Sequence, residues 1–135
     1  MTSIRQLTVG QSAEISKTIT DGDITAFAEV SGDYNPVHLS DEFAAGTRFG
    51  RRIAHGMLSA SLISNVLANH LPGKGTVYLS QTLKFVAPVY PGDTVTARVT
   101  IEAIREDKPI VTLKTVCLNQ SGELLIKGEA VVLIQ

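Results

Sequence analysis

The feature that most restricts the fold is a strongly apolar helical segment that begins near His55 and Gly56 and ends near His70. Its apolar side chains cover roughly 200° of a helical wheel, a wider stripe than that of an ordinary surface helix. These residues are Leu58, Ala60, Leu62, Ile63, Val66 and Leu67. Other elements must surround a helix of this kind. The remaining side would let a ligand or another backbone approach, and it carries Ser61, Ser64, Asn65 and Ala68.

Strand patterns follow this helix. Apolar and polar side chains alternate over residues 77–85 and 94–103, as expected for strands with one buried face. Three turn signals and two further strands complete the pattern. The turns lie at 90–93, 107–109 and 119–122, and the strands at 110–118 and 123–133. We expect strands that are neighbours in the chain to pair as antiparallel hairpins.

A strand and a capped helix are expected before the apolar helix. Ala13 and Ile15 alternate with polar neighbours, which predicts a short strand. Thr20, with Asp23 three positions later, resembles a capping box and predicts the start of a helix. Gly32 is suited to end that helix, because glycine readily adopts the left-handed backbone conformation.

These patterns together predict an α+β fold of the hot-dog type, with one domain over residues 1–135. In this architecture a curved antiparallel sheet wraps around one long central helix. A single sheet of this kind leaves edge strands and the far side of the helix uncovered. We therefore expect a homodimer with a closed two-fold contact.

Composition argues against several kinds of partner. Twelve basic and 13 acidic residues give a net charge of -1, and no basic run is present, so nucleic acid is an unexpected partner. No stretch approaches the roughly 18 apolar residues of a membrane span, and the N-terminus lacks the apolar core of a signal peptide. We expect no membrane partner and a cytoplasmic location.

Motifs for metals and nucleotide cofactors are missing as well. The three histidines lack close metal-ligand spacing, and Cys117 is the only cysteine, so no metal site is expected. We interpret Cys117 as a buried apolar thiol within a strand. The chain has neither a dinucleotide-binding glycine motif nor a phosphate-binding loop.

Candidate acid and base residues lie in the loop that runs from Asp33 to His38. Pro36 fixes its own φ and disfavours the helical region at Asn35, so the loop has a defined conformation. A carboxylate and an imidazole suit proton transfer near neutral pH. Asn35 would orient the loop or a catalytic side chain through its amide. On its own, this spacing more often marks an Asx-type turn beside an incidental surface histidine.

The second candidate segment, residues 51–58, leads into the apolar helix. The first N–H groups of a helix have no intrahelical partner and can receive an anion. Gly56 removes the side chain at the point of closest approach, so its N–H could stabilise an oxyanion formed from a thioester carbonyl. The alternative is that Gly56 only eases a tight turn before the helix.

The two segments together resemble the signature of the MaoC-like, (R)-specific enoyl-CoA hydratases. The matching patterns are Asp33-x-Asn35-Pro36-x-His38 and Ile53-Ala54-His55-Gly56-Met57. The likeness extends over essentially the whole chain and is closest to short hydratases linked to polyhydroxyalkanoate synthesis. It implies a hot-dog fold and hydration of trans-2-enoyl-CoA to (R)-3-hydroxyacyl-CoA. It also implies no cofactor, because coenzyme A is part of the substrate.

The resemblance implies specific roles at five positions. Asp33 and His38 would be the catalytic pair, and Gly56 the backbone oxyanion donor. Ser64 would line the active site, and Leu67, one turn further on, would border the acyl chain. One departure, Arg52, stands where relatives often carry proline, and it affects the expected shape of the loop before the oxyanion donor.

Two other functions stay open on the sequence alone. A hot-dog acyl-CoA thioesterase would hold the same thioester but hydrolyse it. A non-catalytic acyl-CoA-binding subunit would hold it without reaction. Candidate partners for the coenzyme A phosphates are Arg48, Arg51, Arg52, Lys74, Lys84 and Arg105.

Overall fold

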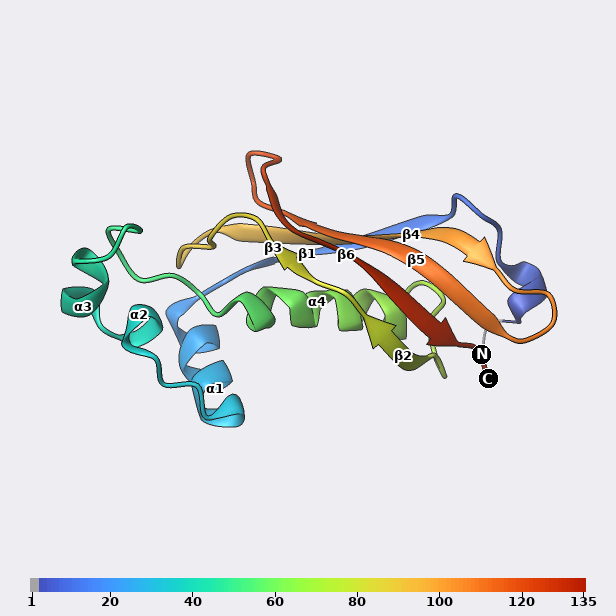
Figure 1. The fold of residues 1–135 in the computed structure, drawn as a ribbon, viewed down its shortest axis with the longest axis horizontal. Helices are drawn as coiled ribbons and strands as arrows, with labels where there is room; N and C mark the ends of the chain where they lie inside the picture. Colours follow the sequence, from blue (N-terminus) through green and yellow to red (C-terminus); the bar gives the residue numbers. More distant parts are fainter. Residues whose placement is uncertain (1–2) are drawn as a thin grey trace.

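A computed structural model describes residues 3–135 and shows one antiparallel sheet with helices on its concave side and at one end (Figure 1). The strands are β1 (Ser12–Thr18), β2 (Val77–Gln81), β3 (Lys84–Phe85), β4 (Thr94–Ile104), β5 (Ile110–Leu118) and β6 (Leu124–Leu133). The helices are α1 (Asp21–Ser31), α2 (Pro36–Leu39), α3 (Asp41–Ala45) and α4 (Gly56–Asn69), after a 3-10 turn, η1 (Ile4–Gln6). None of these helices is long and apolar enough to cross a membrane.

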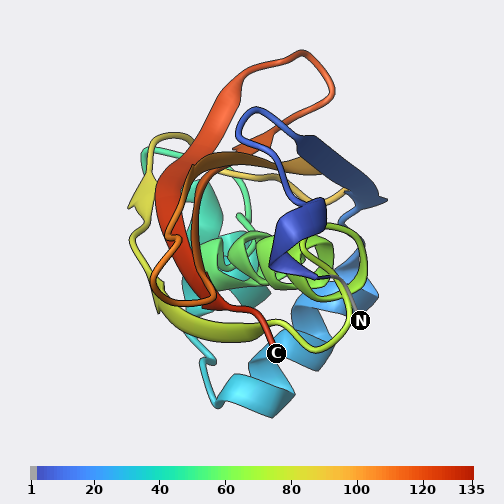
Figure 2. The same cartoon turned by 90° about the vertical axis from the view of Figure 1, so that its right-hand side faces the viewer.

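Helix α4 is the centre of the molecule, and the sheet curls around it (Figure 2). All six side chains of its predicted apolar stripe are at most 9% exposed. They form one core with side chains of the sheet, among them Val95, Ala97 and Val99 of β4. Cys117 of β5 lies in the same core, and burial raises the pKa of its thiol to about 12, so it remains protonated. The wrapped helix confirms the predicted hot-dog architecture.

The sheet order is β1-β4-β5-β6-β2, with β3 also paired to β6. The predicted hairpins of β4 with β5 and of β5 with β6 are present. The predicted pairing of residues 77–85 with the next strand is wrong, because β2 and β3 pair with β6, while β4 pairs with β1. The turn at 90–93 therefore joins strands that are not neighbours.

The segment 77–85 is also interrupted. The register of β2 shifts between Tyr78 and Ser80, and the strand ends at Gln81. The Thr82 main chain then passes so close to β6 that a Cβ at Gly128 would lie 1.8 Å from the Thr82 carbonyl oxygen. The predicted buried face is incomplete in the single chain: Leu83 packs against the core, whereas Leu79 and Phe85 are both 51% exposed.

Local signals place α1 as expected. The Thr20 hydroxyl accepts the Asp23 N–H at 3.1 Å, and the Asp23 carboxylate accepts the Thr20 N–H at 2.9 Å. Gly32 ends the helix with a φ of 79°. Helices α1, α2 and α3 then lie at the end of α4 where α4 begins (Figure 1), so the two candidate segments meet there.

Candidate active site

The loop after α1 is held by its own polar side chains. Asp33 Oδ1 accepts the Asn35 N–H at 3.1 Å, and Asn35 Oδ1 accepts the Val37 N–H at 3.1 Å. Asn35 thereby caps α2, with Pro36 as its first residue. The expected loop is therefore partly helical. An Asx-type turn is indeed present at Asp33, but it uses one carboxylate oxygen only and leaves the other free.

Asp33 and His38 face each other across 3.9 Å, measured from Oδ2 to Nε2. The His38 side chain is 11% exposed and the Asp33 side chain 47% exposed. His38 Nδ1 lies 2.8 Å from the Ile53 carbonyl oxygen. A carbonyl only accepts, so the proton of the neutral ring resides on Nδ1, and Nε2 presents a lone pair towards Asp33. The two atoms are too far apart for a direct hydrogen bond but close enough to share one small molecule.

Gly56 begins α4 beside this pair. The ring of Phe85 lies over it, since a Cβ at position 56 would be 2.6 Å from Phe85 Cε1. Gly56 does not have a positive φ, so a tight turn is not what requires glycine here. Close packing explains the residue instead. Its N–H, the first of the helix, has no intrahelical acceptor.

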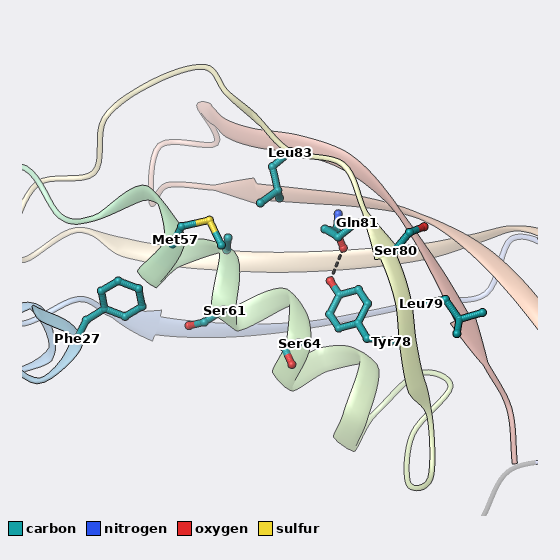
Figure 3. Close-up of a pocket in the computed structure, with 10 residues that line it drawn as sticks. Phe27, Met57, Ser61, Ser64, Tyr78, Leu79, Ser80, Gln81 and Leu83 are labelled. Carbon is teal, nitrogen blue, oxygen red and sulfur yellow. Dashed lines mark hydrogen bonds between the residues drawn. The ribbon is translucent and has the colours of Figure 1, made fainter. Parts of the chain in front are cut away.

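A cavity of about 530 Å³ opens between α4 and β2 (Figure 3). Its lining comprises Phe27, Met57, Ala60, Ser61, Ser64, Tyr78, Leu79, Ser80, Gln81 and Leu83. Most of the lining is apolar. Met57 lies in the first turn of α4, so the cavity extends to the start of this helix. The Tyr78 hydroxyl donates to Gln81 Oε1 on its sheet side (Figure 3). Burial raises the pKa of Tyr78 to about 12, so this hydroxyl stays neutral.

Two predicted binding residues lie differently with respect to this cavity. Ser64 lines it, as expected of a residue near a ligand. Leu67 does not line it: the side chain is 2% exposed and belongs to the core around α4. The helix turns Leu67 into the core that α4 shares with the sheet, so in the single chain it does not border the cavity.

The basic residues considered for phosphate binding are partly engaged elsewhere. Arg52 binds Asp41 of α3 at 2.6 Å and Asp21 of α1 at 2.9 Å, so it joins two helices. Arg105 pairs with Asp107, and the Arg51 guanidinium lies 3.9 Å from the centre of the Tyr90 ring. Arg48 lines a second cavity of about 310 Å³ that it shares with Ile53 and Phe85. Phe85 also covers Gly56, so Arg48 lies in a cavity that shares this ring with the start of α4.

Sequence reasoning missed a third side chain at the site, His55. One atom each of Asp33, His38 and His55 lie within 4.8 Å of one another. The His55 ring is 2% exposed, and its centre is 3.9 Å from that of His38. The one hint in the sequence is that His55 directly precedes Gly56. That position does not reveal which way the side chain points.

Comparisons with known proteins find relatives that match most of the chain. The model of the MaoC like domain matches residues 6–120. The (R)-specific enoyl-CoA hydratase of Aeromonas caviae is 53% identical over 130 residues, which cover 96% of this chain and 97% of that protein. The enzyme of the same name from Rhodospirillum rubrum is 50% identical over 125 residues, with 93% and 86% covered.

A solved structure is also similar over its full length. It is described as an (R)-hydratase from A. caviae involved in PHA biosynthesis, and it superposes with a TM-score of 0.94 and 52% sequence identity. The match covers 97% of this chain and 99% of that one.

Proposed function

The chain belongs to the MaoC-like domain family, and from that membership we propose that it hydrates trans-2-enoyl-CoA to (R)-3-hydroxyacyl-CoA in fatty acid or polyhydroxyalkanoate metabolism. The observation that carries the proposal is the free Oδ2 of Asp33 facing the lone pair on Nε2 of His38 at 3.9 Å. That pair stands at the start of α4, where an N–H without a partner is available. The likeness to two (R)-specific enoyl-CoA hydratases supports the assignment.

The geometry suits a single bridging water. Asp33 Oδ2 and His38 Nε2 are both acceptors, so a shared water donates one O–H to each and turns a lone pair outward. Its oxygen attacks the β-carbon of the enoyl thioester while one O–H bond breaks and its proton passes to the pair. The same pair then returns a proton to the α-carbon. Both new bonds form on one face of the double bond, which makes the addition syn.

Gly56 completes the reaction scheme. As the β-carbon bonds to oxygen, negative charge moves onto the thioester oxygen, and the Gly56 N–H donates to it. A preorganised donor of this kind typically contributes about 10²–10³ in rate, and a positioned acid or base about 10²–10⁴. Asp33 and His38 interact closely, so we treat them as one acid/base unit.

The cavity supplies the place for the acyl chain. Its apolar walls favour an alkyl group, with roughly 0.8 kcal/mol gained for each buried CH₂. Met57, in the first turn of α4, and Phe27, whose ring centre lies 4.9 Å from that of His55, border the end nearest to the reacting atoms, and Ser64 lines the wall further along α4. No group beyond the coenzyme A of the substrate enters this scheme, so the proposal includes no cofactor. We also propose the cytoplasmic location that is expected from the sequence. Cell fractionation would test this location.

We extend the proposal to a homodimer. β2 is an edge strand of the sheet, and it carries half-exposed apolar side chains at Tyr78 and Leu79. Phe85, Val86 and Met57 continue this apolar surface. A second copy that covers it would remove both the free edge and the apolar patch, and would close the open side of the cavity.

The deciding experiment follows the enoyl group and the thiol at the same time. Crotonyl-CoA, hexenoyl-CoA and octenoyl-CoA are incubated with the protein, and the products are separated on a chiral column. Loss of enoyl absorbance without thiol release, with the (R)-alcohol as product, supports the proposal. Thiol release would indicate the thioesterase, and saturable binding without turnover would indicate a binding subunit.

A further inference from the structure

His55 is the N-cap residue of α4, yet its side chain makes no capping hydrogen bond. The ring instead stacks against two others: its centre lies 3.9 Å from that of His38, with 31° between the planes, and 4.9 Å from that of Phe27. Only 2% of the residue is exposed. The side chain is therefore directed into the site rather than along the helix.

One nitrogen of this ring has a clear partner. His55 Nε2 lies 3.0 Å from the backbone carbonyl oxygen of Asp33, and a carbonyl only accepts, so Nε2 carries the proton. The other nitrogen, Nδ1, is buried without a hydrogen-bond partner among residues 3–135. An apolar side chain would fill the same space without leaving a polar atom unsatisfied, so packing alone does not account for histidine here.

We propose that His55 is a positioning residue that sets the distance between Asp33 and His38, an inference that rests on the proposed hydration. It holds the main chain of Asp33 through its Nε2–H and supports the face of the His38 ring by stacking. Elsewhere the Asp33 residue is held by near neighbours in the chain: its backbone N–H donates to the Ser31 hydroxyl at the end of α1, and its half-exposed carboxylate accepts the Asn35 N–H. The Nε2–H of His55 links Asp33 directly to the N-cap position of α4.

This role predicts an effect on turnover rather than on substrate binding. His55 is not among the residues that line the cavity, so its loss should leave KM nearly unchanged. Misplacement of catalytic groups by about 1 Å can reduce the rate by roughly 100-fold. We expect kcat to fall by about that factor when the Asp33 carbonyl loses its donor.

Two substitutions separate the hydrogen bond from the stacking. His55→Phe keeps a stacked ring without a donor, and should lose roughly 100-fold in kcat with KM within about threefold. His55→Gln keeps an N–H donor near the Nε2 position, and should recover roughly tenfold or more of that loss. His70→Gln and His70→Phe, at the exposed far end of α4, serve as matched controls with parental turnover.

Nitrogen-15 spectra of the histidine rings provide a test that needs no variant. The parent protein should show His55 protonated on Nε2 and His38 on Nδ1; the opposite tautomer at His55 would overturn the proposal. Parental turnover in a folded His55→Phe protein would also overturn it, as would a His55→Gln protein no better than His55→Phe. A parent protein without hydratase activity would contradict the proposed function instead, while the tautomers would still report on His55.

Discussion

At the scale of single residues, Asp33 and His38 each have one atom placed to react and one atom that anchors the side chain to the main chain. Asp33 Oδ2 and His38 Nε2 point to a common position, while Asp33 Oδ1 and His38 Nδ1 are occupied by main-chain groups. Each side chain therefore has one free atom and one anchored atom. Substitutions can keep the anchor and either remove the free atom or, as in Asp33→Asn, replace this acceptor with an amide NH₂ donor.

Asp33→Asn and His38→Asn make use of this division. The asparagine amide at 38 can still donate to the Ile53 carbonyl in place of Nδ1, but it has no counterpart to Nε2. We expect each variant to hydrate crotonyl-CoA roughly 10²–10⁴ times more slowly than the parent. Thermal unfolding should stay close to that of the parent, and a folded variant with near-parental turnover would contradict the acid/base assignment.

Gly56→Ala tests the packing at the start of α4. The added methyl group would lie 2.6 Å from the Phe85 ring, so the ring or the helix must move. We expect a loss of about 1 kcal/mol in the free energy of unfolding, the low end for overpacking because Phe85 is half-exposed. Turnover should fall as the N–H shifts.

The double variant Gly56→Ala with Phe85→Ala provides the control. Removal of the ring makes room for the methyl group, so turnover should rise above that of Gly56→Ala alone. Denaturant unfolding and crotonyl-CoA assays of the two single variants and the double variant would show this coupling. Additive effects would mean that the ring is not what requires glycine at this position.

At the scale of secondary-structure elements, the sequence predicted the ends and buried faces of helices better than it predicted which strands pair. The capping box at Thr20, the end of α1 at Gly32 and the wide stripe of α4 all appear as expected, because each depends on residues a few positions apart. The pairing of β2 with β6 depends on where the chain passes after α4, and no short pattern encodes that path. The stack of His55 on His38 was missed for the same reason.

The cap of α1 gives a pH-dependent prediction. The Thr20 N–H donates to the Asp23 carboxylate, and this hydrogen bond, with help from Lys17, holds the pKa of Asp23 below its usual value of 3.8. The folded state thus binds this proton less readily than the unfolded state does. The stabilisation is complete above the ordinary pKa and is lost as the pH falls through the lower folded value.

Asp23→Asn should remove this acid-sensitive part. Its amide oxygen can still accept the Thr20 N–H, but it does not titrate, so the variant should lose less stability than the parent below about pH 4. Near neutral pH the variant should be less stable, by up to about 1 kcal/mol, as is typical for helix caps. Denaturant unfolding at several pH values would measure both differences, and parallel pH profiles would contradict the interpretation.

At the scale of the whole molecule, the uncovered edge at β2 should decide the oligomeric state. Leu79→Lys places a charge on the half-exposed apolar surface beside the cavity. We expect the parent to sediment as a dimer at micromolar concentration and the variant to shift towards monomer. Val30→Lys is the control, because Val30 is 88% exposed on α1, away from β2. A parent protein that sediments as a monomer would contradict the homodimer.

Arg52 has a consequence for the molecule as a whole. It ties α1 to α3 through two carboxylates, and the loop that holds Asp33 and His38 runs between those helices. Where a proline ring would stiffen the chain covalently, this protein relies on attraction between charges. Dissolved ions weaken such attraction, since the screening length falls from about 10 Å at 0.1 M salt to about 3 Å at 1 M. Catalysis should therefore decline as ionic strength rises, and an Arg52→Pro protein should lose that sensitivity.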